Sequence, residues 1–106
     1  MRGVIKGVLA EELENSLRMK REYEKALRGL PKGVLVLKVV KGHSYYYLVK
    51  RVGKKVQYIY KGKVSDAIRK KYDLVKQKRA KYRQLLSQVK KQIKFLKRSL
   101  RGKEEV

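Results

Sequence analysis

The first segment with a regular hydrophobic period covers residues 8–28, where apolar side chains recur every three or four positions. These positions are Leu9, Leu13, Leu17, Tyr23 and Leu27. Such spacing places them on one face of an α-helix. Glutamates crowd the first turns, where the helix dipole favours negative charge, and Gly29 and Pro31 follow as residues that end helices. The pattern therefore predicts a helix over about residues 8–28.

Three short stretches rich in β-branched and aromatic residues follow, at about residues 34–40, 45–52 and 55–60. This composition is typical of strands. Gly42-His43 and Gly53-Lys54 lie between the stretches and suit two-residue hairpin turns. We therefore predict a three-stranded antiparallel meander.

Two-residue turns at these positions would set the register and sort the side chains onto two faces. Val40 would lie opposite Tyr45, and Tyr47 opposite Tyr60. We assign to the core the aliphatic face, which carries Leu35, Leu37, Val39, Tyr46, Leu48 and Ile59. The other face would combine several valines with four tyrosines and two cations, which are Lys38, Tyr45, Tyr47, Arg51, Tyr58 and Tyr60.

Residues 65–101 form the longest periodic segment, and no glycine or proline interrupts it. Ser65 is expected as its N-cap, and Gly102 as the residue that ends it. Apolar residues follow a heptad with positions Ile68, Tyr72, Val75, Arg79, Tyr82, Leu86, Val89, Ile93, Leu96 and Leu100. Arg79 alone breaks this seam, so we predict a long helix with coiled-coil packing.

The fold class predicted for residues 1–106 is α+β in a single domain: a helix, a β-meander and a long helix. A helix over residues 8–28 is too short to cover the whole heptad seam. We therefore predict a homodimer whose interface contains Tyr82, Leu86, Val89, Ile93, Leu96 and Leu100. The alternative is a C-terminal helix that is solvated or frayed.

Charge changes the picture most, because the 106 residues carry a formal net charge of +22. Residues 1–31 are nearly balanced, whereas residues 32–103 contain 24 basic side chains and only two acidic ones, Asp66 and Asp73. Self-repulsion of this size destabilises a compact chain unless a partner of opposite sign relieves it. Nucleic acid is the commonest such partner, and an anionic membrane surface is the second.

The basic residues and the exposed tyrosines together define the candidate contacts to nucleic acid. Tyrosine rings stack on bases of any sequence, and cations bind phosphates. The candidates are Lys38, Tyr45, Tyr47, Arg51, Lys54, Lys55, Tyr58, Tyr60, Lys61, Lys63, Arg69, Lys70 and Lys76. Two alternatives stay open for the tyrosines, which also suit a protein interface or plain packing between strands.

Other chemistry finds little support in the sequence. His43 is the single histidine, in a predicted turn, and there is no cysteine, so we expect no metal site. Asp66 and Asp73 lie seven residues apart on one helix, and no phosphate-binding glycine loop occurs. We expect neither an enzyme nor a cofactor. The sequence also contains no stretch typical of a membrane span or signal peptide, so we expect a cytoplasmic protein, with a composition reminiscent of thermophiles.

From Leu30 to Lys63 the chain resembles a family of small uncharacterised archaeal and bacterial proteins. The shared pattern is roughly L-P-K-G-x-L, then K-G-x-x-Y-Y-Y-L, then G-x-K-V-x-x-x-Y-x-G-K. It is matched here by Leu30-Pro31-Lys32-Gly33, Lys41-Gly42, Tyr45-Tyr46-Tyr47-Leu48, Gly53, Lys55-Val56, Tyr60 and Gly62-Lys63, with Lys61 as an additional residue. The resemblance implies a β-meander module followed by a helix, suggests nucleic-acid binding, and supplies no catalytic residues.

These observations lead to one main functional hypothesis and two alternatives. The main one is a sequence-tolerant nucleic-acid-binding protein, expected to be a DNA-binding dimer with an architectural or regulatory role. The first alternative is a coiled-coil module for protein–protein interaction, whose charge serves solubility or an acidic partner. The second is an RNA-binding protein of the ribosome-associated type.

Overall fold

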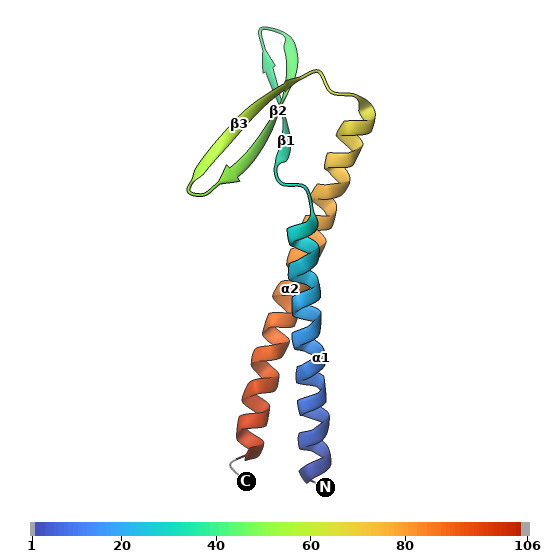
Figure 1. Ribbon diagram of the computed structural model, residues 1–106, viewed down its shortest axis with the longest axis vertical. Helices are drawn as coiled ribbons and strands as arrows, with labels where there is room; N and C mark the ends of the chain where they lie inside the picture. Colours follow the sequence, from blue (N-terminus) through green and yellow to red (C-terminus); the bar gives the residue numbers. More distant parts are fainter. Residues whose placement is uncertain (1, 105–106) are drawn as a thin grey trace. The chain divides into compact units, whose positions relative to one another are not determined.

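A computed structural model describes residues 2–104 and shows two helices and one three-stranded sheet (Figure 1). The elements follow each other as α1 (Arg2–Gly29), β1 (Val34–Val40), β2 (His43–Val52), β3 (Lys55–Gly62) and α2 (Asp66–Glu104). The sheet is antiparallel, with β2 in the middle. The predicted α+β fold is thereby confirmed.

The element bounds agree best for β1 and least for the two helices. α1 begins at Arg2 instead of residue 8, and α2 continues through Gly102 to Glu104, so assigning Gly102 as the residue that ends the helix was wrong. Glycine in a helix interior costs about 1 kcal/mol relative to alanine. Gly102 was therefore expected to end the helix, but such propensities are weak and other interactions override them.

The chain divides into two compact units. The helical unit consists of Met1–Gly29 and Ala80–Val106, and the sheet unit consists of Leu30–Arg79. α2 belongs to both units, because Asp66–Arg79 lies in the sheet unit and the rest of the helix in the helical unit.

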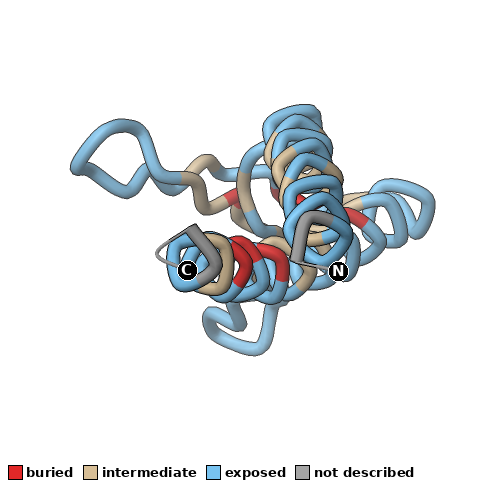
Figure 2. Tube along the Cα trace, turned by 90° about the horizontal axis from the view of Figure 1, so that it is seen from below, coloured by how far each residue is buried: buried red, intermediate tan, exposed pale blue. Residues whose placement is uncertain are grey.

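In the helical unit α1 and the C-terminal part of α2 lie side by side and run in opposite directions (Figure 1). Val89, Ile93 and Leu96 are only 3%, 7% and 5% exposed. In Figure 2 the buried segments of the C-terminal part of α2 lie on its side that is turned toward α1. Farther along, the rings of Tyr23 and Tyr82 are 6.2 Å apart between centroids. The core of this unit is thus formed by the heptad seam of α2 against α1.

This core changes the argument for a homodimer. The prediction assumed that the first helix was too short to cover the seam, whereas α1 has 28 residues. Val89, Ile93 and Leu96, three of the six predicted interface residues, are already buried in the single chain. Pairing two copies through them would require α1 to leave the seam. The dimer and the coiled-coil geometry stay predictions.

Ser16 is the most deeply buried side chain of the described residues, with 1% exposure. Its hydroxyl has no hydrogen-bond partner within the described part of the chain. A buried hydroxyl without a partner loses its hydration without compensation, at a cost of about 1–3 kcal/mol. A small side chain at this position nevertheless fits the closely packed interior of the helical unit.

Replacing Ser16 by alanine should therefore raise the free energy of unfolding by about 1 kcal/mol, because it removes the unpaired hydroxyl and improves helix propensity. Replacing Ser16 by leucine should lower that free energy by about 1–3 kcal/mol through overpacking. Urea unfolding followed by circular dichroism measures both changes. A clear loss of stability in Ser16→Ala would mean that the hydroxyl has a stabilising partner.

In the sheet unit the two hairpins differ in how well the sequence predicted them. β2 and β3 pair as expected, with Tyr47 opposite Tyr60 and Gly53 at φ 63° in the turn. β1 and β2 turn at Lys41-Gly42, with φ values of 51° and 79°, so that Val40 faces His43 instead of Tyr45. Two positive φ values define a type I′ turn, which usually contains Asn, Asp or Gly, so Lys41 was not an obvious candidate.

The error in the first hairpin leaves both faces of the sheet intact. The observed register differs from the predicted one by two residues, since Lys38 faces Tyr45 instead of Tyr47. Side chains alternate between faces with a period of two, so an even shift returns each side chain to the face predicted for it.

The aliphatic face is only partly core. Leu48 and Val75 are each 7% exposed and form the buried centre of the sheet unit, with Leu35, Tyr46 and Ile59 half-buried. Leu37 and Val39 are 49% and 66% exposed, so assigning these two to the core was wrong. They lie toward the Lys41-Gly42 end of β1, away from the pair formed by Leu35 and Leu48.

Arg79, the single charged residue in the heptad seam, has a structural role in the sheet unit. Its Nη2 donates a hydrogen bond to the carbonyl oxygen of Pro31 at 2.7 Å. The guanidinium also reaches the carbonyl oxygen of Gly33, at 3.4 Å from Nη1 and 3.5 Å from Nη2. Arg79 thus ties α2 to the segment that leads into β1.

Replacing Arg79 by alanine should lower the free energy of unfolding by about 1.5–3 kcal/mol, because hydrogen bonds from a charged donor are lost and two carbonyls lose their partner. Arg79→Lys should recover only part of this loss, since an ammonium lacks the forked geometry of a guanidinium. Arg83→Ala, on an exposed position of the same helix, is the matched control. Equal urea midpoints for Arg79→Ala and Arg83→Ala would contradict the prediction.

Candidate nucleic-acid interface

One face of the sheet gathers the tyrosines that the sequence placed together. Tyr45 and Tyr47 alternate along β2, Tyr58 and Tyr60 alternate along β3, and Lys38 lies on the same side of β1; we call these five residues the tyrosine face. Ring centroids of Tyr47 and Tyr60 are 5.4 Å apart in an edge-on arrangement, and those of Tyr45 and Tyr60 are 5.9 Å apart. Such pairs contribute about 0.5–1.5 kcal/mol beyond area burial.

The rings of this face differ in their exposure. Tyr58 and Tyr60 are 61% and 58% exposed, whereas Tyr45 and Tyr47 are half-buried. Two large aromatic surfaces of β3 are therefore open to solvent, whereas the two rings of the central strand β2 are partly covered. Exposed aromatic groups that lie together on a surface commonly mark a binding site.

Lys38 places a positive charge among the rings. Its Nζ lies 5.1 Å from the ring centroid of Tyr47 and 5.1 Å from that of Tyr58. Each cation–π contact at an exposed site contributes about 0.5–1 kcal/mol. The ammonium is thus held over the tyrosine face, where it also remains accessible, since Lys38 is exposed.

Two further residues extend the tyrosine face along β2. The His43 ring lies 6.2 Å from that of Tyr45, at the first position of the strand. Sequence reasoning treated His43 as a turn residue, although its alternation with Tyr45 would have placed it on this face had the turn been known. Arg51 occupies the same face farther along β2, opposite Val56, and Lys54 and Lys55 follow at the adjoining turn.

Lys61 and Lys63 lie apart from the tyrosine face. A bulge follows Tyr60, because Tyr47 pairs with Tyr60 but Tyr46 pairs with Gly62, which leaves Lys61 as the extra residue. Both lysines line a hollow of about 350 Å³ near the start of α2, together with Leu35, Val64, Ser65, Ile68, Lys71 and Tyr72. The structure therefore groups Lys61 and Lys63 with Lys71, apart from the tyrosine rings.

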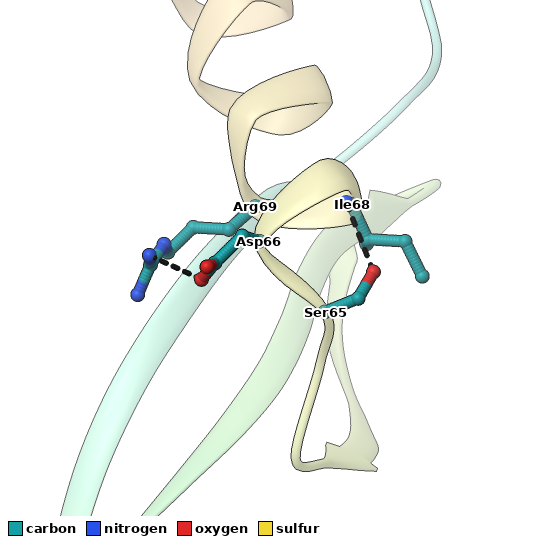
Figure 3. A network of polar contacts seen from close by, with 4 residues as sticks. All are labelled: Ser65, Asp66, Ile68 and Arg69. Atoms are coloured by element: carbon teal, nitrogen blue, oxygen red, sulfur yellow. Dashed lines mark hydrogen bonds and ion pairs between the residues drawn. The ribbon is translucent and has the colours of Figure 1, made fainter.

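The beginning of α2 holds the candidate Arg69 in local interactions (Figure 3). Ser65 caps the helix as predicted, since its Oγ accepts a hydrogen bond from the Ile68 amide at 3.3 Å. The Arg69 Nη2 donates to Asp66 Oδ1 at 2.6 Å. Hydrogen bonding with the Tyr46 side chain and the nearby Asp66 carboxylate raise the pKa of Arg69. Arg69 is thus already engaged, whereas Lys70 and Lys76 are exposed.

The positive charge of the chain is hardly neutralised from within. The described residues contain two ion pairs, Lys20 with Glu24 at 3.8 Å and Arg69 with Asp66 at 2.6 Å, each within one helix. Residues 34–62, which contain the whole sheet, carry seven basic side chains and no acidic one. The sheet therefore presents a positive surface that its own side chains do not offset.

Residues 2–104 offer neither a cluster of metal ligands nor a helix that could cross a bilayer. This part of the chain contains no group of three or more His, Asp or Glu side chains placed to hold a metal ion. Within the same range, neither helix has a stretch long and apolar enough to cross a bilayer. Comparisons with protein-family models, curated proteins and solved structures found no match to this chain.

Proposed function

We propose that this protein binds nucleic acid without base preference, with DNA as the expected ligand and a cytoplasmic, architectural or regulatory role. The observation that carries the proposal is the positive sheet, with seven basic and no acidic side chains over residues 34–62. Phosphates neutralise such a surface, and the counterions that they release drive binding of any sequence.

The second supporting feature is the tyrosine face beside these cations. Aromatic rings interleaved with lysines are typical of surfaces that bind nucleic acids in a sequence-tolerant way, because every base has a flat face on which a ring can stack. A basic surface that served solubility alone would not require exposed rings. The exposed rings of the tyrosine face therefore favour nucleic-acid binding over the alternative that the charge serves solubility alone.

The alternative of a coiled-coil interaction module is less well supported. A module of this kind needs an apolar seam for its partner, and Val89, Ile93 and Leu96 are already buried in the helical unit. RNA binding draws on the same cations and rings as DNA binding. Competition between DNA and RNA strands of equal length at fixed salt separates these two ligands.

The proposal is tested by titrating the protein into fluorescently labelled 20-nucleotide DNA and RNA, single-stranded and duplex, at low salt. The double variant Lys54→Gln, Lys55→Gln should bind more weakly to every sequence and reduce the salt slope by about one for each lost phosphate contact. Lys6→Gln, Lys25→Gln in α1 removes the same charge and should change binding far less. No binding of DNA or RNA at low salt would overturn the proposal.

A further inference from the structure

We infer that the tyrosine face binds an unpaired strand, with bases stacked on Tyr58 and Tyr60 and a phosphate held by Lys38. This inference rests on the proposed function and specifies the form of nucleic acid that the site takes. It also divides the tyrosines by role. Tyr58 and Tyr60 contact bases, whereas Tyr45 and Tyr47 support the platform.

The width of the face favours a single strand over a duplex. The tyrosine face extends across all three strands, from Lys38 on β1 to Tyr58 and Tyr60 on β3. The major groove of B-DNA admits one α-helix or a two-stranded ribbon, which is narrower than this sheet. In a duplex the flat faces of bases are also stacked on each other and closed to a protein ring, whereas unpaired bases offer them freely.

The spacing of the two exposed rings suits a strand whose bases are separated. Tyr58 and Tyr60 are two residues apart on β3, which corresponds to about 7 Å along a strand. Stacked bases in B-DNA rise only about 3.4 Å per step. Neighbouring bases that occupied both rings would therefore have to be spread apart, which an unpaired strand permits and a duplex opposes.

Tyr60 is held ready for such stacking by its neighbours. Tyr45 and Tyr47 approach it at 5.9 and 5.4 Å between centroids. Gly62 adds to this, because a Cβ on Gly62 would lie 3.3 Å from the Tyr60 hydroxyl, so the missing side chain leaves room for the ring. A preformed ring loses little conformational freedom when a base binds, which favours affinity.

Lys38 lies where it can bind the phosphate of a base that stacks on the tyrosine face. Its ammonium lies 5.1 Å from both the Tyr47 and the Tyr58 centroid, next to one of the two exposed rings. A base on Tyr58 brings its phosphate near this charge. A protein partner would instead bury several cations of the sheet without acidic residues from this chain to balance them, and unpaired buried charges are costly.

The experiment compares single-stranded and duplex 20-mers with wild-type protein, Tyr58→Ala, Tyr60→Ala and the matched controls Tyr58→Phe and Tyr60→Phe. We expect tighter binding to the single strand. Each alanine should weaken single-strand affinity by about 5- to 150-fold and leave duplex affinity and the salt slope nearly unchanged. The phenylalanine variants keep a ring and should bind like wild type.

Tyrosine fluorescence supplies a second measurement that needs no alanine variant. The chain contains eight tyrosines and no tryptophan, so its ultraviolet emission reports on the tyrosines alone. A stacked base should quench part of this emission when a single strand binds, and Tyr58→Phe, Tyr60→Phe should remove that quenching. This result remains readable even if an alanine variant fails to fold, which circular dichroism would show.

The possible outcomes distinguish the inference from the proposed function. Duplex binding as tight as single-strand binding, or alanine variants that fold and bind like wild type, would overturn the inference and leave nucleic-acid binding intact. Absence of quenching by a bound single strand would overturn it as well. Failure of every strand to bind at low salt would remove the proposed function itself.

Discussion

Raising the salt concentration from about 50 to about 200 mM is expected to weaken nucleic-acid binding by on the order of 10³- to 10⁴-fold. The sheet unit carries eight of the proposed basic contacts without an ion pair among the described residues: Lys38, Arg51, Lys54, Lys55, Lys61, Lys63, Lys70 and Lys76. Each phosphate contact contributes about −0.9 to the slope of log K against log salt for duplex DNA and about −0.7 for single strands.

If all eight take part, the slope should approach about −7 on duplex DNA and about −6 on single strands. Fluorescence anisotropy at four or five salt concentrations measures it. The variant Lys6→Gln, Lys25→Gln controls for total charge, because both lysines lie on α1 in the helical unit and belong to none of the proposed contacts. A slope near zero would mean that binding does not depend on phosphates, and would favour the interaction-module hypothesis.

Replacing Gly33 by alanine should lower the free energy of unfolding by on the order of 3 kcal/mol. Gly33 has φ +101°, a conformation that other residues rarely adopt. A Cβ there would lie 2.8 Å from Leu48 Cδ1, 3.1 Å from Leu48 Cγ and 3.2 Å from the Val49 carbonyl oxygen. Leu48 is buried in the core of the sheet unit, so it has little room to move. Backbone strain and overpacking therefore add.

Gly7→Ala is the matched control, since a Cβ at Gly7 would meet nothing within 4 Å and the residue lies in α1. This variant should gain about 1 kcal/mol from helix propensity. Urea unfolding followed by circular dichroism compares the two. Similar changes in both variants would show that Gly33 is not constrained as its geometry indicates.

Local patterns of the sequence were sufficient for the order of elements and for the composition of the two sheet faces. The alternation of Tyr45, Tyr47, Tyr58 and Tyr60 predicted a shared face, and the structure places all four there, with Tyr45 and Tyr47 against Tyr60. This prediction survived a register error of two residues, because the side-chain period of a strand is also two. The capping role of Ser65 could also be predicted from local sequence, because a helix cap depends on residues only three positions apart.

Other features depended on contacts between distant parts of the chain and had no local signal. In the sequence Arg79 is only a charged residue that interrupts the apolar heptad. Its hydrogen-bond partners Pro31 and Gly33 lie more than forty residues away, so no local pattern indicates them. Leu37 and Val39 have the same strand pattern as Leu48 but are exposed, because alternation specifies a face and not what covers it. The hydrogen bonding of Arg69 with Tyr46 likewise joins the start of α2 to a residue of β2 more than twenty positions earlier.

The sequence by itself thus determined the α+β class, the excess of positive charge and the pairing of tyrosines with cations on one face, because each follows from composition or from periods of two and about three and a half residues. Only the tertiary structure decided that α1 covers the C-terminal part of the α2 seam, that Ser16 is buried without a partner among the described residues and that Tyr58 and Tyr60 stay open to solvent. Burial depends on which surfaces meet in space, and neither charge nor period specifies that.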